Sequence, residues 1–176
     1  MNLLARAFYN LEEALEGAGP AEEQIEELPG EQNGATAQII QEGDLKGVLK
    51  IVVDGYLPRA RHATSVMRRS WIGKITRALL PIDVHFERAF CVIAIYVPAK
   101  VNWDVDNRYY KFIIDAIRFA RVIDDDSCQR LSFMVIGGVD PENPRTEIYI
   151  VNQPFEEHVF VYKLLKHIII EGKNQG

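Results

Sequence analysis

The chain has 176 residues, of which 48% are hydrophobic, so it can bury a core and is not an intrinsically disordered polypeptide. Its formal net charge of −5 is unevenly spread, because ten acids against two bases leave residues 1–46 at −8 while the remainder carries +3. The acidic total therefore does not exclude a polyanionic partner for the larger part of the chain.

The sequence also argues against zinc proteins, membrane-spanning proteins and secreted proteins. Cys91 and Cys128 are isolated and have no His partners at metal-ligand spacing, so a zinc site is not predicted. No apolar run approaches the roughly 20 residues that span a bilayer. The first residues lack the basic and apolar regions of a signal peptide. We therefore expect a soluble, cytoplasmic protein with reduced cysteines.

The N-terminal quarter of the chain is predicted to be an appendage. Apolar residues recur at helical spacing over residues 2–17, and Gly17, Gly19 and Pro20 end this helix. Residues 18–45 are rich in Glu, Gly and Gln with little apolar content, which is typical of an acidic linker. The chain therefore divides into an amphipathic helix with a linker, residues 1–45, and a compact body, residues 46–176.

The first part of the body alternates strand and helix patterns. Proline and glycine punctuate these patterns, and Pro81 and Pro98 end a helix and a strand respectively. In chain order we predict a strand over 48–53, a basic loop over 58–63, a helix over 64–80, a central strand over 89–97 and a helix over 107–121.

The last part of the body is predicted to be a hairpin and a helix. Two strands over 131–136 and 146–151 are separated by turn residues, which favours antiparallel pairing between them. A final helix over about 152–171 follows, although the run Val159-Phe160-Val161 also suits a strand. The predicted fold class is α+β, with a small mixed sheet and helices packed on it.

A group of polar residues around the helix over 107–121 carries the chemistry. Asp104 and Asp106 precede this helix, and the run Asp124-Asp125-Asp126 follows it. One polar stripe of the helix carries Asn107, Lys111, Asp115 and Arg118. Carboxylates that hold Mg²⁺ can activate water and neutralise a phosphate, and a lysine can hold that phosphate. The aspartates meet only if the chain after the helix returns as a strand beside the Asp104 segment.

Each of these residues also has an ordinary structural explanation. Asp104 or Asp106 alone is most simply the N-cap of a helix, and an aspartate run after a helix is usually a solvated turn. Lys111 and Asp115 suit a surface ion pair one helical turn apart. The combination of D-x-D-N, a polar helical stripe and D-D-S is what favours a metal site over these alternatives.

With these motifs the sequence resembles the RusA family of Holliday junction resolvases, crossover junction endodeoxyribonucleases common in phages and prophages. The resemblance covers roughly residues 47–151. It rests on a strand leading into Gly55, Pro58 and basic residues, then on D-x-D-N, on Lys with Asp four residues later, and on D-D-S. Lys111 stands four residues after Asn107, where the family pattern has three, and Arg108 is a possible substitute for it.

The resemblance implies a RusA-like endonuclease domain over residues 46–176 that resolves four-way DNA junctions in recombination and repair. It implies a homodimer that needs Mg²⁺, with Mn²⁺ as a substitute. Asp104, Asp106 and Asp126 match the carboxylates that bind metal in the family, and these three with Lys111 match its catalytic residues.

A basic segment between the first strand and Pro81 is the predicted DNA-binding surface. Its candidate residues are Arg59, Arg61, Arg68, Arg69 and Lys74. Two alternative functions stay open, a less selective nuclease for flaps or other branched DNA, and a non-catalytic DNA-binding or assembly protein that keeps the fold.

Overall fold

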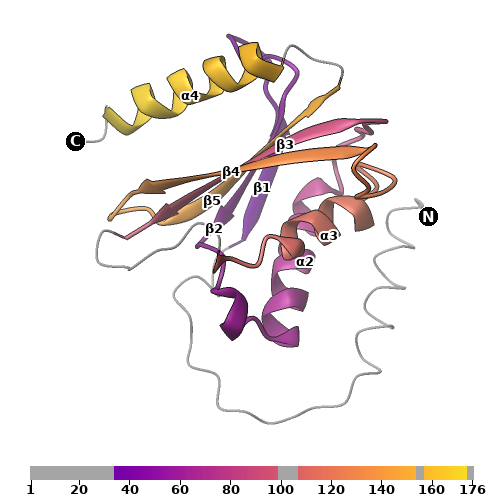
Figure 1. Cartoon of the computed structure of the whole chain (residues 1–176), viewed down its shortest axis with the longest axis vertical. Helices are drawn as coiled ribbons and strands as arrows, with labels where there is room; N and C mark the ends of the chain where they lie inside the picture. Colours follow the sequence, from indigo (N-terminus) through magenta and orange to yellow (C-terminus); the bar gives the residue numbers. More distant parts are fainter. Residues whose placement is uncertain (1–33, 99–106, 154–156, 174–176) are drawn as a thin grey trace.

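The structure is a computed structural model that describes residues 34–98, 107–153 and 157–173 (Figure 1). Its elements in chain order are β1 (Ala35–Ile39), β2 (Leu49–Asp54), η1 (Ala60–His62), α2 (Ser65–Leu79), β3 (Ala89–Val97), α3 (Lys111–Phe119), β4 (Leu131–Val139), β5 (Arg145–Asn152) and α4 (Glu157–Lys173). Within these ranges, no helix has the length and apolar character that crossing a membrane requires.

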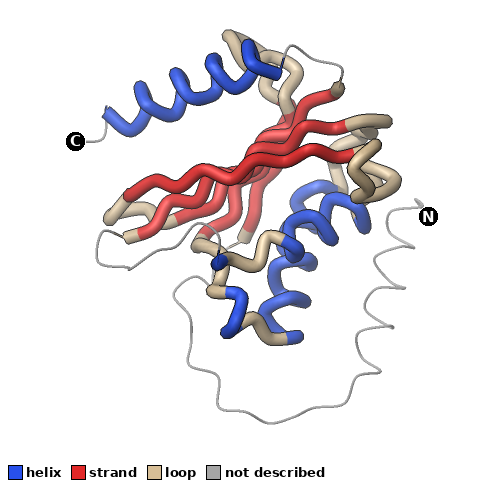
Figure 2. Tube along the Cα trace, in the orientation of Figure 1, coloured by secondary structure: helices blue, strands red, loops and turns tan. Residues whose placement is uncertain are grey.

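The strands form one five-stranded mixed sheet with helices on both of its faces. The strand order is β1-β2-β5-β3-β4, and only the β3–β4 pair is parallel. Helices α2 and α3 cover one face, and α4 lies across the other (Figure 2). The predicted α+β class with a small mixed sheet is confirmed.

Strand β3 lies at the centre of the two apolar cores. Cys91, Ile93 and Ile95 point into the core beneath α2 and α3, while Phe90 and Val92 pack with Phe160 and Leu164 of α4. A strand buried on both faces is nearly continuous in apolar residues, which explains why residues 89–97 were predicted without error. The final helix is also confirmed, and the strand alternative for residues 159–161 is wrong.

The predicted β4–β5 hairpin is wrong. Strand β5 lies between β2 and β3, and β4 pairs with β3 on the opposite side of β3 from β5. The backbone N–H of Asp140 donates to the carbonyl of Val97 where the connection passes the end of β3. Six consecutive residues of β5 are buried, so both of its faces are covered, as expected for an inner strand of the sheet.

Two local differences from the sequence predictions bear on the site. Residues 35–39 form an edge strand inside the segment predicted as linker, with Ala35, Ala37 and Ile39 packed on the core. Helix α3 begins at Lys111, because Arg108 forms a β-bridge with Arg59 and the N–H of Tyr109 donates to Pro58. The helix over 64–80 is confirmed, with Thr64 as its N-cap. The helix over 2–17 lies outside the described residues.

Candidate anion-binding site

A buried aspartate on α3 organises a group of basic side chains around it. Helix α3 buries Phe112, Ile113 and Ala116 against the sheet and α2, as its apolar stripe predicts. Asp115 is also buried, with 1% of its side chain exposed. Burying an ionised carboxylate is costly unless cations and hydrogen-bond donors surround it, so its partners define the site.

Three basic side chains surround the Asp115 carboxylate. Oδ2 accepts hydrogen bonds from Arg68, at 3.0 Å from Nη2 and 3.3 Å from Nε. Oδ1 accepts one from Lys111 Nζ at 3.1 Å and lies 3.8 Å from Arg118 Nη2. Arg68 comes from α2 and the other three from α3, so the packing of these two helices assembles the group. We call Arg68, Lys111, Asp115 and Arg118 the Asp115 cluster.

The cluster presents cations to solvent while hiding its carboxylate. The side chains of Arg68, Lys111 and Arg118 are 41%, 55% and 37% exposed. Three positive charges on one negative charge leave the cluster with a formal charge of +2. Because a single buried carboxylate holds these side chains near one another, they are partly ordered before any ligand arrives, which lowers the entropy lost on binding.

The aspartate run lies beside the cluster, and its three carboxylates have different partners. Asp124 Oδ1 lies 3.1 Å from His85 Nε2. Asp125 accepts a hydrogen bond from the N–H of Asp126 at 2.8 Å. Hydrogen bonds from the Ser127 side chain and from that N–H hold the pKa of Asp125 below its ordinary value. Asp126 Oδ1 lies 3.4 Å from Arg118 Nη1, so Asp126 is the member that contacts the cluster.

The other predicted metal ligands, Asp104 and Asp106, lie outside the described residues. Leu131 pairs with Ala89 and Val139 with Val97, so β4 returns beside β3. The metal hypothesis requires a return beside the Asp104 segment, which lies outside the described residues. The aspartate run lies at the end of the sheet where β3 begins, since Phe86 pairs with Ile123 before it and Ala89 pairs with Leu131 after it. In the part of the chain that the structure describes, no three His, Cys, Asp or Glu side chains are grouped to hold a metal ion.

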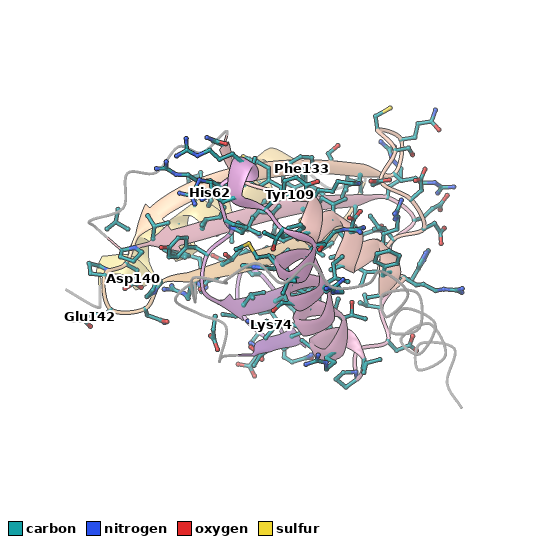
Figure 3. All side chains as sticks on the ribbon, turned by 90° about the horizontal axis from the view of Figure 1, so that it is seen from below. His62, Lys74, Tyr109, Phe133, Asp140 and Glu142 are labelled. Atoms are coloured by element: carbon teal, nitrogen blue, oxygen red, sulfur yellow. The ribbon has the colours of Figure 1, made fainter. Side chains whose placement is uncertain are left out.

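The predicted DNA-binding residues separate into three places. Arg59 and Arg61 lie at η1, where Arg61 Nε donates to His62 Nε2 at 2.8 Å. Arg68 belongs to the Asp115 cluster. Arg69 follows it on α2, and Lys74 lies further along that helix, away from His62 (Figure 3). These residues therefore do not form one stripe along α2.

Arg108, the possible substitute for Lys111, has a structural role. It is 6% exposed, its Nη1 donates to the carbonyl of Leu57 at 2.9 Å, and its guanidinium lies 5.9 Å from the Tyr56 ring centroid. Sequence reasoning placed Lys111, Asp115 and Arg118 on one polar stripe but missed the pairing of Arg68 with Asp115. That pair is 47 residues apart in sequence, and no local spacing reveals it.

No family model and no curated protein matches the chain. Solved structures do match it. A periplasmic domain of Helicobacter pylori MotB is 13% identical, with a TM-score of 0.40 over 76% of this chain and 91% of that one. A second MotB periplasmic domain is 14% identical, with a TM-score of 0.36 over 90% of both chains. At these values the likeness assigns no function of MotB to this chain.

The comparisons correct the family predicted from the motifs. The solved structures that match the chain include MotB periplasmic domains, which are not RusA-family resolvases. The predictions that depended on that family are therefore withdrawn. The withdrawn activity is that of a Holliday junction resolvase, an endodeoxyribonuclease of recombination and repair. The flap-nuclease and DNA-binding alternatives are withdrawn with it, as are the branched-DNA partner and the homodimer.

Proposed function

We propose that this chain binds phosphate-bearing anions at the Asp115 cluster. The observation that carries the proposal is the set of three partly exposed basic side chains held on one buried carboxylate. Guanidinium groups present planar pairs of donors that match phosphate oxygens, and an ammonium group adds a compact charge. The cluster contains two arginines and one lysine, which supports phosphate as the bound group.

Burial of Asp115 supports a binding role over an ordinary surface ion pair. An exposed pair contributes roughly 0 to 1 kcal/mol and leaves both side chains mobile. In this cluster the carboxylate is inaccessible, so an incoming anion meets cations whose orientation is already restricted. The anion supplies the negative charge that the +2 cluster lacks.

We further propose that Mg²⁺, or Mn²⁺ as a substitute, accompanies the anion and is bound by Asp104, Asp106 and Asp126. Support comes from the chemistry of these donors, because hard carboxylate oxygens are preferred ligands of Mg²⁺. Asp126 also lies next to the cluster through its contact with Arg118. A cation at Asp126 would bring its charge close to an anion bound at the cluster.

We place this activity in a reducing compartment such as the cytoplasm. Cys91 and Cys128 are both free thiols, the state that a reducing compartment maintains. Burial raises the pKa of the Cys91 thiol to about 12, so this thiol stays protonated and inert in the core.

Isothermal titration calorimetry with pyrophosphate tests the anion site. We expect Lys111→Gln to weaken binding about fivefold, because it removes one exposed cation while the Gln amide can still donate a hydrogen bond to Asp115. Lys46→Gln is the matched control, since Lys46 is exposed on the turn between β1 and β2, and it should bind as the unaltered protein does. Absence of binding by the unaltered protein, or equal loss in both variants, would contradict the proposal.

A separate titration with MgCl₂ alone tests the metal site. We expect Asp106→Asn to weaken Mg²⁺ binding, because it replaces a charged oxygen ligand with a neutral amide. The control Asp54→Asn alters a carboxylate at the end of β2 and should leave the affinity unchanged. Equal Mg²⁺ binding by Asp106→Asn and the unaltered protein would remove Asp106 from the proposed ligands.

A further inference from the structure

An exposed aromatic side chain lies close to the N-terminal turn of α3, where the Asp115 cluster begins. Phe133 of the edge strand β4 is 49% exposed. Val135, two residues further along β4, packs on the core beneath α2 and α3, so Phe133 projects from the face of the sheet that carries α3. The ring centroid of Phe133 lies 6.4 Å from that of Tyr110, the residue directly before Lys111.

The position of Phe133 distinguishes it from an ordinary exposed apolar residue. Among the exposed large apolar side chains of the described ranges, the aromatic ones are Phe133 and Tyr162. Tyr162 lies on α4, on the other face of the sheet from the cluster (Figure 2). Tyr110 has helical backbone angles, and successive residues of a helix differ by 100° in direction. The aromatic pair and Lys111 therefore occupy adjacent sides of one helical turn.

We infer that the anion bound at the Asp115 cluster is a free nucleotide, whose base stacks on Phe133 while its phosphate groups contact the cations of the cluster. This inference rests on the proposed function. A nucleotide has a flat aromatic base at one end and phosphate groups at the other, which matches an aromatic ring and a group of cations at one turn of α3. Every base has a π-face, so this stacking accepts any base.

A single base matches this surface better than a nucleic acid strand does. Proteins that bind single strands without sequence preference stack successive bases on several aromatic side chains, along a basic groove that follows the backbone. On this face of the described structure, Phe133 is the one exposed aromatic side chain, and the basic residues of α2 do not form a stripe that could follow a strand. The arrangement therefore favours a free nucleotide, such as a nucleoside diphosphate.

Isothermal titration calorimetry with ADP and with pyrophosphate tests the inference, because pyrophosphate has two linked phosphate groups and no base. We expect the unaltered protein to bind ADP about tenfold more tightly than pyrophosphate, the scale of one stacked base. Phe133→Ala removes the ring, so it should weaken ADP binding about tenfold and leave pyrophosphate binding unchanged. Phe133→Tyr keeps an aromatic ring and should keep the preference for ADP. The control Tyr162→Ala removes an exposed ring from the other face of the sheet and should change neither affinity.

The outcomes distinguish this inference from the proposed function. If ADP binds no more tightly than pyrophosphate, or if Phe133→Ala leaves the ratio of the two affinities unchanged, the stacking is wrong while the anion site stands. Loss of the preference in Phe133→Tyr as well would attribute the effect to altered packing of β4 and also overturn the inference. If pyrophosphate does not bind, the proposed function fails and the inference fails with it. A circular dichroism melt of each variant establishes that it is folded before affinities are compared.

Discussion

Two acidic side chains, Asp115 and Glu147, are buried on opposite faces of the sheet with their charges satisfied in different ways. Asp115 has three basic partners that reach solvent. Glu147 accepts hydrogen bonds from Tyr149 at 2.5 Å and from Arg145 at 2.7 Å, and Lys50 lies 3.7 Å away. Arg145 is only 13% exposed, so the Glu147 group is closed to ligands and serves stability.

Substitution of Glu147 should change how stability depends on pH. Burial acts to raise the pKa of Glu147, but hydrogen bonds from Tyr149 and Arg145 and the charge of Lys50 outweigh it, so the pKa lies below its ordinary 4.5. A lowered folded-state pKa contributes stability that is present above the unfolded-state pKa and is lost as pH falls through the folded value. Glu147→Gln should therefore cost about 2 kcal/mol at neutral pH and progressively less in acid.

Urea denaturation at neutral pH and at several values from about pH 5 to about pH 3 measures this difference. The two curves of unfolding free energy against pH should converge as the solution becomes acidic. Asp140→Asn is a comparison variant, because Arg145 also donates to Asp140 and the pKa of Asp140 is likewise lowered. Parallel curves for Glu147→Gln and the unaltered protein would contradict the assignment.

Residues of the site were predictable only as far as local spacing extends. The helical stripe of Lys111, Asp115 and Arg118 follows from 3.6 residues per turn, and all three do lie together. Burial of Asp115 was not predictable, because it depends on Arg68 arriving from α2. The same limit applies to Glu147, whose neighbours Lys50 and Arg145 come from different strands.

Among the elements, β4 contains a glycine that lies tightly against an aromatic ring of the neighbouring strand. It is an edge strand, and a Cβ added to Gly138 would lie 2.9 Å from Cδ1 of Tyr96 on the neighbouring β3. The Tyr96 ring is itself held, because the Arg145 guanidinium lies 4.0 Å from its centroid. Because Gly138 has no side chain, the Tyr96 ring of β3 can lie against β4 while it also contacts Arg145 of β5.

Gly138→Ala should lower the free energy of unfolding by about 1 kcal/mol, because the ring must shift and overpacking outweighs the entropy gained on replacing glycine. Thermal or urea denaturation measures the change. Gly34→Ala is the matched control, since a Cβ there meets nothing within 4 Å, and it should be neutral or slightly stabilising. Equal stability of the two variants would show that Tyr96 yields without cost.

Elements with strong local patterns were predicted well, and their partners were not. A continuous apolar run identified β3, and helical periodicity identified α2. Capping residues favoured α4, with a strand as the alternative. Strand β1 was missed because its five residues include the polar Thr36 and Gln38 and follow an acidic stretch. The β4–β5 pairing was wrong because turn residues predict where a chain reverses, but not which strand it then joins.

For the whole molecule, composition predicted the class of fold but not its topology or the protein's family. Strand and helix patterns in one chain were enough to predict a domain with one sheet and helices packed on it. Three short motifs suggested a family that the comparisons did not support, because D-x-D and D-D-S are short enough to occur in unrelated chains. The charge imbalance between the N-terminal segment and the body remains a property of the sequence alone, since residues 1–33 lie outside the described structure.

The position of β5 between β2 and β3 also determines when the chain can fold during synthesis. Leu49 of β2 pairs with Ile150 of β5, so β2 leaves the ribosome about 5 to 20 s before its partner does, at usual rates of elongation. Until then β2 has only β1 as a strand partner, and a two-stranded ribbon is marginally stable in water unless a helix such as α2 packs on it. The sheet is therefore completed late, and nascent chains that do not yet include β5 should be substrates for chaperones and proteases.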